Sequence, residues 1–220
     1  MANAFIFDMD GVVVNSEPLH IITLRTIFRR YGITYSLKEH ATKYGGTGAR
    51  HIIEGVLQEH GVSADIDKLV AERTEMYQRL IRTRKLRTIA GFSRFLTHAK
   101  KLGVKVAIAS GGHRTNIISS LRAIKISPRL FGGIITVENV PQRKPHPQLF
   151  IAAARVLRAK PSECVVFEDT TAGVEAAKRG KMKCVALLTT MTQSKLRAAG
   201  ADLIVKDFRD KKLWQWLGRK

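Results

Sequence analysis

Two acidic residues stand one position apart, directly after an apolar run near the start of the chain. Residues 4–7 are apolar and lead into Asp8, Met9 and Asp10, and Gly11 follows. A strand that ended here would deliver both carboxylates to the carboxyl edge of a sheet, where open α/β sheets bind ligands. Carboxylates this close repel unless a cation lies between them or one is protonated. The pair therefore predicts a cation or acid–base site, with a capped turn before Gly11 as the alternative.

A second acidic pair, Glu168 and Asp169, follows the apolar run of residues 164–167. Taken alone, Asp169 is compatible with the N-cap of the helix expected next. If both apolar runs are strands of one parallel sheet, however, their carboxyl ends lie at the same edge. The two acidic pairs would then meet, and together they predict a site for a hard cation such as Mg²⁺.

Two further runs are followed by residues of the opposite chemistry. Ser110 and Gly111 come after residues 104–109, and Lys144 lies on a proline-flanked segment before an expected helix. Hydroxyl groups and glycine amides can donate to phosphate oxygens. A lysine ahead of a helix is usually a surface residue, so the case for Lys144 rests on the residues around it. Acids with a cation on one side, and a hydroxyl, amides and an ammonium group on the other, indicate a phosphoryl-transfer site.

The elements that must position these residues alternate between strands and helices. Strands are predicted at residues 4–8, 104–109, 133–137, 164–167, 183–187 and 202–205. Helical patterns separate most of the later strands, for example at residues 147–157 and at residues 171–179, with Gly180 at the C-terminal cap of the second. This alternation is typical of a parallel sheet built from βαβ units. The fold class is therefore predicted to be α/β, with a Rossmann-like parallel-sheet core.

The long interval between the first two strands is predicted to be a helical insertion. Four helices are expected in it. The first runs from Pro18 to about Tyr31, and a short second one opens with a capping box at Ser36. The third ends at Gly61, and the fourth runs from Ile66 to Arg82. Amphipathic helices of this kind bury their apolar stripes against one another, so they should form a small bundle. We expect a core domain of residues 1–14 and 88–220 and a helical cap domain of residues 15–87. Ligands tend to bind in the cleft between two such lobes.

Taken in order, the four motifs resemble those of the haloacid dehalogenase superfamily, in particular its phosphatase and β-phosphoglucomutase members with a helical cap. Asp8-Met-Asp10-Gly-Val is the first motif, Ser110 the second and Lys144-Pro the third, and Glu168-Asp169-Thr-Thr-Ala-Gly is the fourth. The likeness covers essentially the whole chain. Each motif is weak alone, but the set at this spacing is specific.

The resemblance implies a role for each motif residue. Asp8 would be the nucleophile that forms an aspartyl-phosphate, and Asp10 would be the general acid and base. The phosphoryl group would be bound by Ser110, Gly111 and Lys144. Mg²⁺ would be the cofactor, held by Asp8, Asp10 through its backbone carbonyl, Asp169 and Glu168. An acid two positions after the nucleophile also favours phosphate-ester chemistry over the dehalogenases of the superfamily, which lack it.

Substrate specificity is expected to come from the cap. Residues 44–50 join two predicted cap helices, where relatives place a specificity loop, and they include Thr47 and Arg50. Arg50 could meet a second anionic group of the substrate, or it could be a solvated arginine in a plain connection. Glu17 and His20 follow the first linker near the nucleophile, although His20 could equally be an ordinary helix residue.

Three further residues lie next to the second and third motifs. His113 and Arg114 follow Ser110 and are weaker candidates, with surface positions as the alternative. Gln148 stands where relatives commonly have an aspartate, and this departure could alter how Lys144 is held.

The leading functional hypothesis is a Mg²⁺-dependent phosphatase that hydrolyses a small phosphate monoester of the sugar phosphate class. A mutase of the β-phosphoglucomutase type is the first alternative, because it uses the same aspartyl-phosphate. The second alternative is a basic protein associated with nucleic acid. It is suggested by 38 Lys and Arg against 18 Asp and Glu, a formal net charge of +20.

The composition bounds the remaining possibilities. A chain of 220 residues with 45% apolar residues can bury a substantial core, and its apolar runs are too short for a transmembrane helix. Cys164 and Cys184 lie in strand-like runs and are expected to be buried thiols. We expect a cytoplasmic monomer whose partner is a small phosphorylated metabolite, with no membrane partner. Most of the basic residues are expected to form a solvated surface, because no basic motif of a nucleic-acid-binding fold is present.

Overall fold

The computed structural model describes residues 3–44, 48–84 and 86–218. Six parallel strands form one sheet in the order β3-β2-β1-β4-β5-β6. They are β1 (Ala4–Phe7), β2 (Lys105–Ala109), β3 (Gly133–Ile135), β4 (Cys164–Glu168), β5 (Lys183–Leu187) and β6 (Leu203–Val205). Each strand lies where the sequence predicted it, to within two residues. The predicted α/β class and parallel sheet are confirmed.

The central position of β1 follows from its composition. All four residues of β1 are buried, and it pairs with β2 on one side and β4 on the other. Parallel strands covered on both faces need apolar residues at every position, which explains the continuous run rather than an alternating one. Cys164 and Cys184 are buried free thiols in β4 and β5, as predicted.

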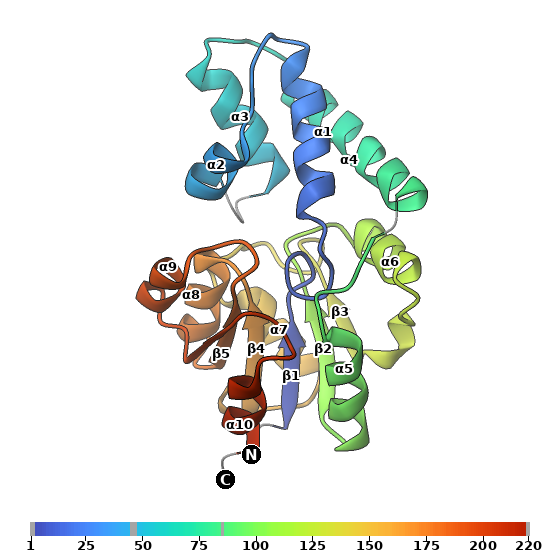
Figure 1. Cartoon of the computed structure of the whole chain (residues 1–220), viewed down its shortest axis with the longest axis vertical. Coiled ribbons are helices and arrows are strands. Elements are labelled where there is room, and N and C mark those ends of the chain that lie inside the picture. The colour runs from blue at the N-terminus through green and yellow to red at the C-terminus, as the bar shows by residue number, and fades with distance from the viewer. Residues whose placement is uncertain (1–2, 45–47, 85, 219–220) are drawn as a thin grey trace.

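Helices cover both faces of the sheet (Figure 1). One face packs against α5 (Phe92–Lys101), α6 (Arg114–Ala123) and α10 (Lys211–Gly218), around a cluster of phenylalanine rings that includes Phe7, Phe95 and Phe167. The other face packs against α7 (Gln148–Val156), α8 (Thr171–Arg179) and α9 (Gln193–Ala198). Among the described residues, no helix combines the length and the apolar character that crossing a membrane requires.

Four further helices lie beyond the carboxyl edge of the sheet (Figure 1). They are α1 (Glu17–Arg29), α2 (Leu37–Glu39), α3 (Ala49–Glu59) and α4 (Ile66–Thr83), with a π-helical turn η1 (His40–Tyr44) after α2. Their apolar stripes form a cluster of their own that includes Phe28, Tyr35 and Ile53. The capping box predicted at Ser36 is confirmed, because Ser36 Oγ accepts a hydrogen bond from the Glu39 amide at 3.0 Å.

The chain passes between the four helices and the sheet twice, and the two connections lie side by side. Val14 forms an antiparallel bridge with Thr88, and the Asn15 amide donates to the Arg87 carbonyl at 2.9 Å. A contact between α4 and α6, in which Gln78 Nε2 donates to Asn116 Oδ1 at 3.1 Å, adds a third link. The helical layer therefore rests on the sheet next to residues 8–10.

Candidate active site

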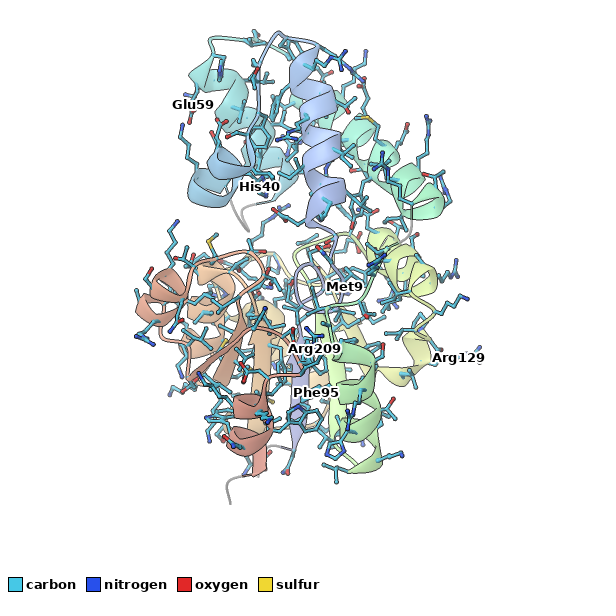
Figure 2. The ribbon with its side chains drawn as sticks, viewed as in Figure 1. Met9, His40, Glu59, Phe95, Arg129 and Arg209 are labelled. Carbon is cyan, nitrogen blue, oxygen red and sulfur yellow. The ribbon has the colours of Figure 1, made fainter. Side chains whose placement is uncertain are left out.

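Asp8 follows β1 directly and lies at the carboxyl edge of the sheet. Its amide donates to the Phe167 carbonyl of β4 at 3.0 Å, so the backbone position of Asp8 is fixed by the neighbouring strand. The side chain is buried. Figure 2 shows Met9, the next residue, at the boundary between the sheet and the helices above it.

Lys144 lies between Asp8 of the first motif and Glu168 of the fourth motif and contacts both. Its Nζ lies 2.5 Å from Asp8 Oδ1 and also contacts Glu168 Oε1. Burial alone would lower the pKa of Lys144, but the charges of Asp8 and Glu168 raise this pKa above its ordinary value. Burial also raises the pKa of Asp8 to about 7, with repulsion from Glu168 adding to the effect and Lys144 opposing it. An aspartate with a raised pKa and a charged lysine thus stand together in a buried site.

Glu168 has both carboxylate oxygens engaged by protein groups. Oε1 contacts Lys144, while Oε2 accepts hydrogen bonds from the Asp169 amide at 2.8 Å and from the Thr170 amide and hydroxyl at 2.9 Å each. The carboxylate fits only because residue 173 is glycine, since a β-carbon there would overlap it. These contacts make Glu168 a residue that positions Lys144.

Asp169 is the acid with spare binding capacity. Its Oδ2 accepts from Thr189 Oγ1 at 3.2 Å and contacts Thr190 Oγ1, but its Oδ1 is buried and has no hydrogen-bond partner among the described residues. Burial raises the pKa of Asp169 well above its usual range, and the neighbouring Glu168 and Asp8 add to the rise. A buried oxygen without a partner costs free energy, which a bound cation would offset.

Gly11 makes the close approach of this carboxylate possible. Its φ is +76°, and a β-carbon at this position would overlap Asp169 Oδ2. The Gly11 carbonyl also accepts a hydrogen bond from Thr189 Oγ1 at 2.7 Å. The threonines after β5 thus tie the first and fourth motifs together, a role that the sequence did not suggest.

Asp10 points away from the other acids and toward the helices above. Its Oδ1 accepts from Ser16 Oγ at 2.5 Å and lies 3.2 Å from His20 Nε2. Burial would raise the pKa of Asp10, but its interactions with His20 and the hydrogen bond from Ser16 lower this pKa to about 2. Asp10 is therefore held as a carboxylate by Ser16, just before α1, and by His20 of α1.

Arg73 of α4 completes this arrangement and was not singled out as a site residue from the sequence. Its guanidinium contacts His20 Nδ1, so this nitrogen must accept and Nε2 must carry the proton toward Asp10. The arginine also lies 5.0 Å from the centroid of the Tyr77 ring, on which His20 stacks. Arg73 is buried, with 7% of its surface exposed. An arginine within the apolar stripe of a predicted helix is the sequence signal that could have revealed it.

Ser110 lies where the second motif was expected. It is buried at the end of β2, and its Oγ accepts a hydrogen bond from the Gly112 amide at 3.1 Å. Gly111 is exposed, with open space where a side chain would stand. The topology of the sheet brings Ser110 to the same edge as Asp8, because β1 and β2 are parallel neighbours.

The other candidates of the cap have partners away from this edge. Glu17 Oε1 lies 2.8 Å from His40 Nε2, and Figure 2 shows His40 within the helical layer. Arg50 pairs with Glu54 at 3.0 Å and contacts Asp67, both on exposed helix surfaces. The structure therefore brings His20 into contact with Asp10, places Glu17 within the range of the Asp10 charge, and pairs Arg50 with acids of the helical layer. Thr47 lies outside the described residues.

Three residues beside the second and third motifs brace loops. His113 Nδ1 lies 3.0 Å from Glu138 Oε1, and the Arg114 amide donates to the same carboxylate at 3.2 Å. Gln148 Oε1 accepts from the Gln142 amide at 3.2 Å, which closes the loop that carries Lys144. Gln148 thus holds this loop through its side-chain oxygen.

The four acids do not converge on one point. Among the residues that the structure describes, no three acidic, histidine or cysteine side chains form a ready cation site. The reasons are that Asp10 turns toward His20 and that Lys144 occupies the space beside Glu168. The expected ligand set, in which Asp10 takes part through its backbone carbonyl rather than its carboxylate, stays a prediction. Asp8 and the unpartnered oxygen of Asp169 still fit a cation, because each is a buried carboxylate whose pKa is raised.

Comparison with known proteins decides the family. Residues 5–187 match the haloacid dehalogenase-like hydrolase family. The chain belongs to the haloacid dehalogenase-like hydrolases. Protein SUPPRESSOR OF QUENCHING 1, chloroplastic, of Arabidopsis thaliana is 34% identical over 209 residues, which cover 93% of this chain and 20% of that protein. This haloacid dehalogenase-like chain thus spans only about a fifth of that relative.

A second relative matches from end to end. Validoxylamine A 7'-phosphate phosphatase of Streptomyces hygroscopicus subsp. limoneus is 30% identical over 218 residues, which cover 99% of each chain. Among solved structures, CbbY of Rhodobacter sphaeroides in complex with phosphate aligns with a TM-score of 0.85 at 24% identity, over 96% of each chain. The structural likeness supports the fold of this haloacid dehalogenase-like hydrolase.

Proposed function

We propose that this chain is a phosphatase that hydrolyses a small phosphate monoester, of the sugar phosphate class, through an aspartyl-phosphate on Asp8. The contact between Lys144 and Asp8, beside the buried acid Asp169, is the observation that carries the proposal. A carboxylate that attacks a phosphate dianion meets charge repulsion, and a fixed ammonium group offsets this repulsion in the transition state. The name of the end-to-end relative, a phosphatase of a phosphorylated compound, supports the same reaction class.

In the first step, an Asp8 oxygen attacks phosphorus and the bond from phosphorus to the leaving-group oxygen breaks. The leaving alkoxide takes a proton from Asp10, which must be protonated at that moment. Asp10 is held as a carboxylate in the structure. A phosphate dianion next to Asp10 raises its pKa, since like charges disfavour ionisation, so substrate binding helps to load the proton.

In the second step, water attacks the phosphorus of the acyl phosphate and the bond to Asp8 breaks. Asp10 accepts a proton from this water, and inorganic phosphate and the free Asp8 carboxylate are released. The orientation of Asp10 matters in both steps, and His20 with Arg73 sets it. Ser110 and Gly111 would donate hydrogen bonds to the phosphoryl oxygens beside Lys144.

Mg²⁺ is the cofactor that the donor set fits. Asp8, Asp169 and the backbone carbonyl of Asp10 would hold it, because they supply the hard oxygen ligands that Mg²⁺ prefers. When bound, Mg²⁺ neutralises charge on the phosphoryl oxygens. Glu168 would act indirectly, by holding Lys144 in place.

The test is a phosphate-release screen with purified protein and Mg²⁺ over a panel of phosphorylated metabolites. We expect release from at least one sugar phosphate by the native protein and none by the Asp8→Asn variant. Incubation with β-glucose 1-phosphate and a bisphosphate activator separates the mutase alternative, since glucose 6-phosphate without free phosphate would indicate a mutase. No release from any compound, or full turnover by Asp8→Asn, would refute the phosphatase.

A further inference from the structure

Much of the excess positive charge gathers at the end of the sheet that lies opposite the candidate active site. We call this surface the amino pole, because it consists of the helix ends and loops that precede strands β2 to β5. In a parallel sheet with crossover helices, these segments all return to the same edge. The basic residues of the amino pole are Lys100, Lys101, Lys105, Arg122, Lys125, Arg129, Arg155, Arg158, Lys160, Lys181 and Lys183.

These bases are exposed and are not neutralised. None of them forms an ion pair with an acid in the part of the chain that the structure describes. The two acids nearby are occupied, because Glu163 accepts from Asn3 at 3.2 Å and from the Lys160 amide at 2.9 Å, and Asp202 pairs with Lys178 at 2.7 Å. The amino pole therefore presents a surface on which bases greatly outnumber acids.

Exposed aliphatic side chains lie among these bases. Leu102 is 67% exposed, Val156 is 48% exposed and Leu130 is 39% exposed, and each of them directly follows a lysine or arginine in the chain. They belong to the few large apolar residues of the described chain that are exposed at all. Exposed apolar groups that gather in one region mark interaction sites, whereas scattered ones do not.

Direct contacts join the segments of the amino pole into one surface. Lys105 Nζ, at the start of β2, donates to the Arg158 carbonyl after α7 at 3.3 Å. The Gly132 amide, next to Leu130 and Phe131, donates to the Val106 carbonyl at 2.8 Å. The side chain of Val156 packs directly over Gly133. In Figure 2, Arg129 extends outward from the side of the core, after helix α6.

Three of the bases occupy positions that favour glycine. Lys125, Arg158 and Lys181 follow helices α6, α7 and α8 with φ values of +59°, +50° and +57°. Glycine is the usual residue at such left-handed helix ends, because a β-carbon is strained there. Attraction to the negative end of the helix accounts for part of this preference for bases. It does not account for exposed leucine and valine side chains between them.

We propose that the amino pole docks this protein on the surface of an anionic lipid bilayer, with the carboxyl edge of the sheet facing the aqueous phase. Bases attract acidic headgroups, and aliphatic side chains beside them can enter the boundary of the acyl region. Nucleic acid is negatively charged like the acidic headgroups. Proteins bind single strands through stacking on aromatic side chains, however, whereas the exposed large apolar residues of the amino pole are aliphatic. This proposal differs from the expectation of no membrane partner. The bases and aliphatic residues of the amino pole are scattered in the sequence, and only the fold brings them to one surface.

The test is flotation of the full chain with vesicles, at physiological and at low salt. Vesicles that contain phosphatidylserine or phosphatidylglycerol should bind the protein, and pure phosphatidylcholine vesicles should not. The Lys100→Gln/Lys101→Gln variant should weaken partitioning about 30-fold, since each base near an anionic surface contributes a factor of about five. The Leu102→Ser/Val156→Ser variant should weaken it about tenfold at unchanged charge.

Matched controls come from the cap. Leu37 is 57% exposed on α2, so Leu37→Ser removes an equally exposed leucine at a different site and should leave vesicle binding unchanged. Phosphate release should be the same in all of these variants, which separates this proposal from the proposed function. Absence of binding to anionic vesicles, or an equal loss with Leu37→Ser, would overturn the proposal. Binding to RNA that exceeds vesicle binding and ignores Leu102→Ser/Val156→Ser would also overturn it, in favour of a nucleic-acid surface.

Discussion

The ammonium group of Lys144 lies 2.5 Å from the carboxylate of Asp8, although the two residues are 136 positions apart in the chain. Glu168 holds the lysine from the other side, and Gly173 leaves room for Glu168. Lys144 of the third motif and Glu168 of the fourth therefore place a positive charge beside Asp8 of the first motif. Several measurable consequences depend on this relationship.

Replacement of Lys144 should abolish most of the activity. Lys144→Ala leaves the charge of Asp8 without its cation, so we expect kcat to fall by about 10²–10³, the range found when one donor to a developing charge is removed. Lys144→Arg is the matched control, since it keeps the charge but changes the geometry. Steady-state kinetics on the best substrate from the screen provide the test, and a kcat within threefold of native for Lys144→Ala would argue against a direct role.

The stability of the metal-free protein should fall as pH rises. The pKa of Asp8 is raised to about 7 and that of Asp169 is also raised, so the folded state binds more protons than the unfolded state between about pH 4 and pH 7. The free energy of unfolding therefore decreases with pH through this window. Thermal melts in EDTA should show a Tm lower by several degrees at pH near 7.5 than at pH near 5.5.

Asp8→Asn supplies the comparison for this pH effect. The amide does not ionise, so the variant should lose part of the dependence of Tm on pH and should be the more stable protein at pH near 7.5. An identical pH dependence in the variant and the native protein would show that Asp8 is not the titrating group.

Mg²⁺ should raise Tm, and Asp169 should be needed for the effect. Asp169 carries the buried unpartnered oxygen, so Asp169→Asn should reduce the Mg²⁺-induced rise in Tm, whereas Asp207→Asn, a change at an acid outside the site, should retain it. Melts with and without Mg²⁺ read out binding independently of catalysis. A full Mg²⁺ effect in Asp169→Asn would place the ion elsewhere.

Three glycines offer a test of the close contacts at the edge of the sheet. A β-carbon at Gly11 or Gly173 would overlap the carboxylate of Asp169 or Glu168, whereas Gly111 has open space around it. Gly11→Ala and Gly173→Ala should each destabilise the fold by about 1–3 kcal/mol and reduce activity. Gly111→Ala should leave stability unchanged. Urea unfolding measures the difference, and equal stability of all three variants would contradict these contacts.

His20 and Arg73 should control the protonation of Asp10. His20→Gln keeps a hydrogen-bond donor near Asp10, while His20→Ala removes it, so the alanine variant should raise the pKa of Asp10 above about 2. Arg73→Met should act in the same direction, because it removes the partner that fixes the His20 proton. The readout is the pH dependence of kcat, and variants that lowered kcat equally at every pH would indicate a purely structural role.

The sequence was sufficient for the strands and for the family. Continuous apolar runs followed by acids, a hydroxyl or a lysine identify both the strands and the edge where they end, and the four motifs identify the family that the comparison confirms. The proposed division into a core domain and a cap domain stays a prediction. Helices α5, α9 and α10 were not predicted, and all three are short, with 10, 6 and 8 residues.

Contacts between distant side chains lay beyond the sequence. Nothing in the pattern shows that Asp10 turns toward His20, or that Arg73 stands behind His20 from a helix more than 50 residues away. The same holds for Thr189 and Thr190, which bind Asp169 after a strand with no acid at its end. These contacts depend on how the helical layer sits on the sheet. Periodicity predicts helices but does not fix their placement.

The most direct test of the account is the identification of the phosphorylated residue. Native protein and the Asp10→Asn variant are mixed with substrate and Mg²⁺, quenched in acid within one turnover and digested for mass spectrometry. The account predicts phosphate on the peptide that contains Asp8, with both slower formation and slower loss of this phosphate in Asp10→Asn, because Asp10 serves both steps. Phosphate on another residue, or turnover without any phosphorylated peptide in either protein, would contradict it.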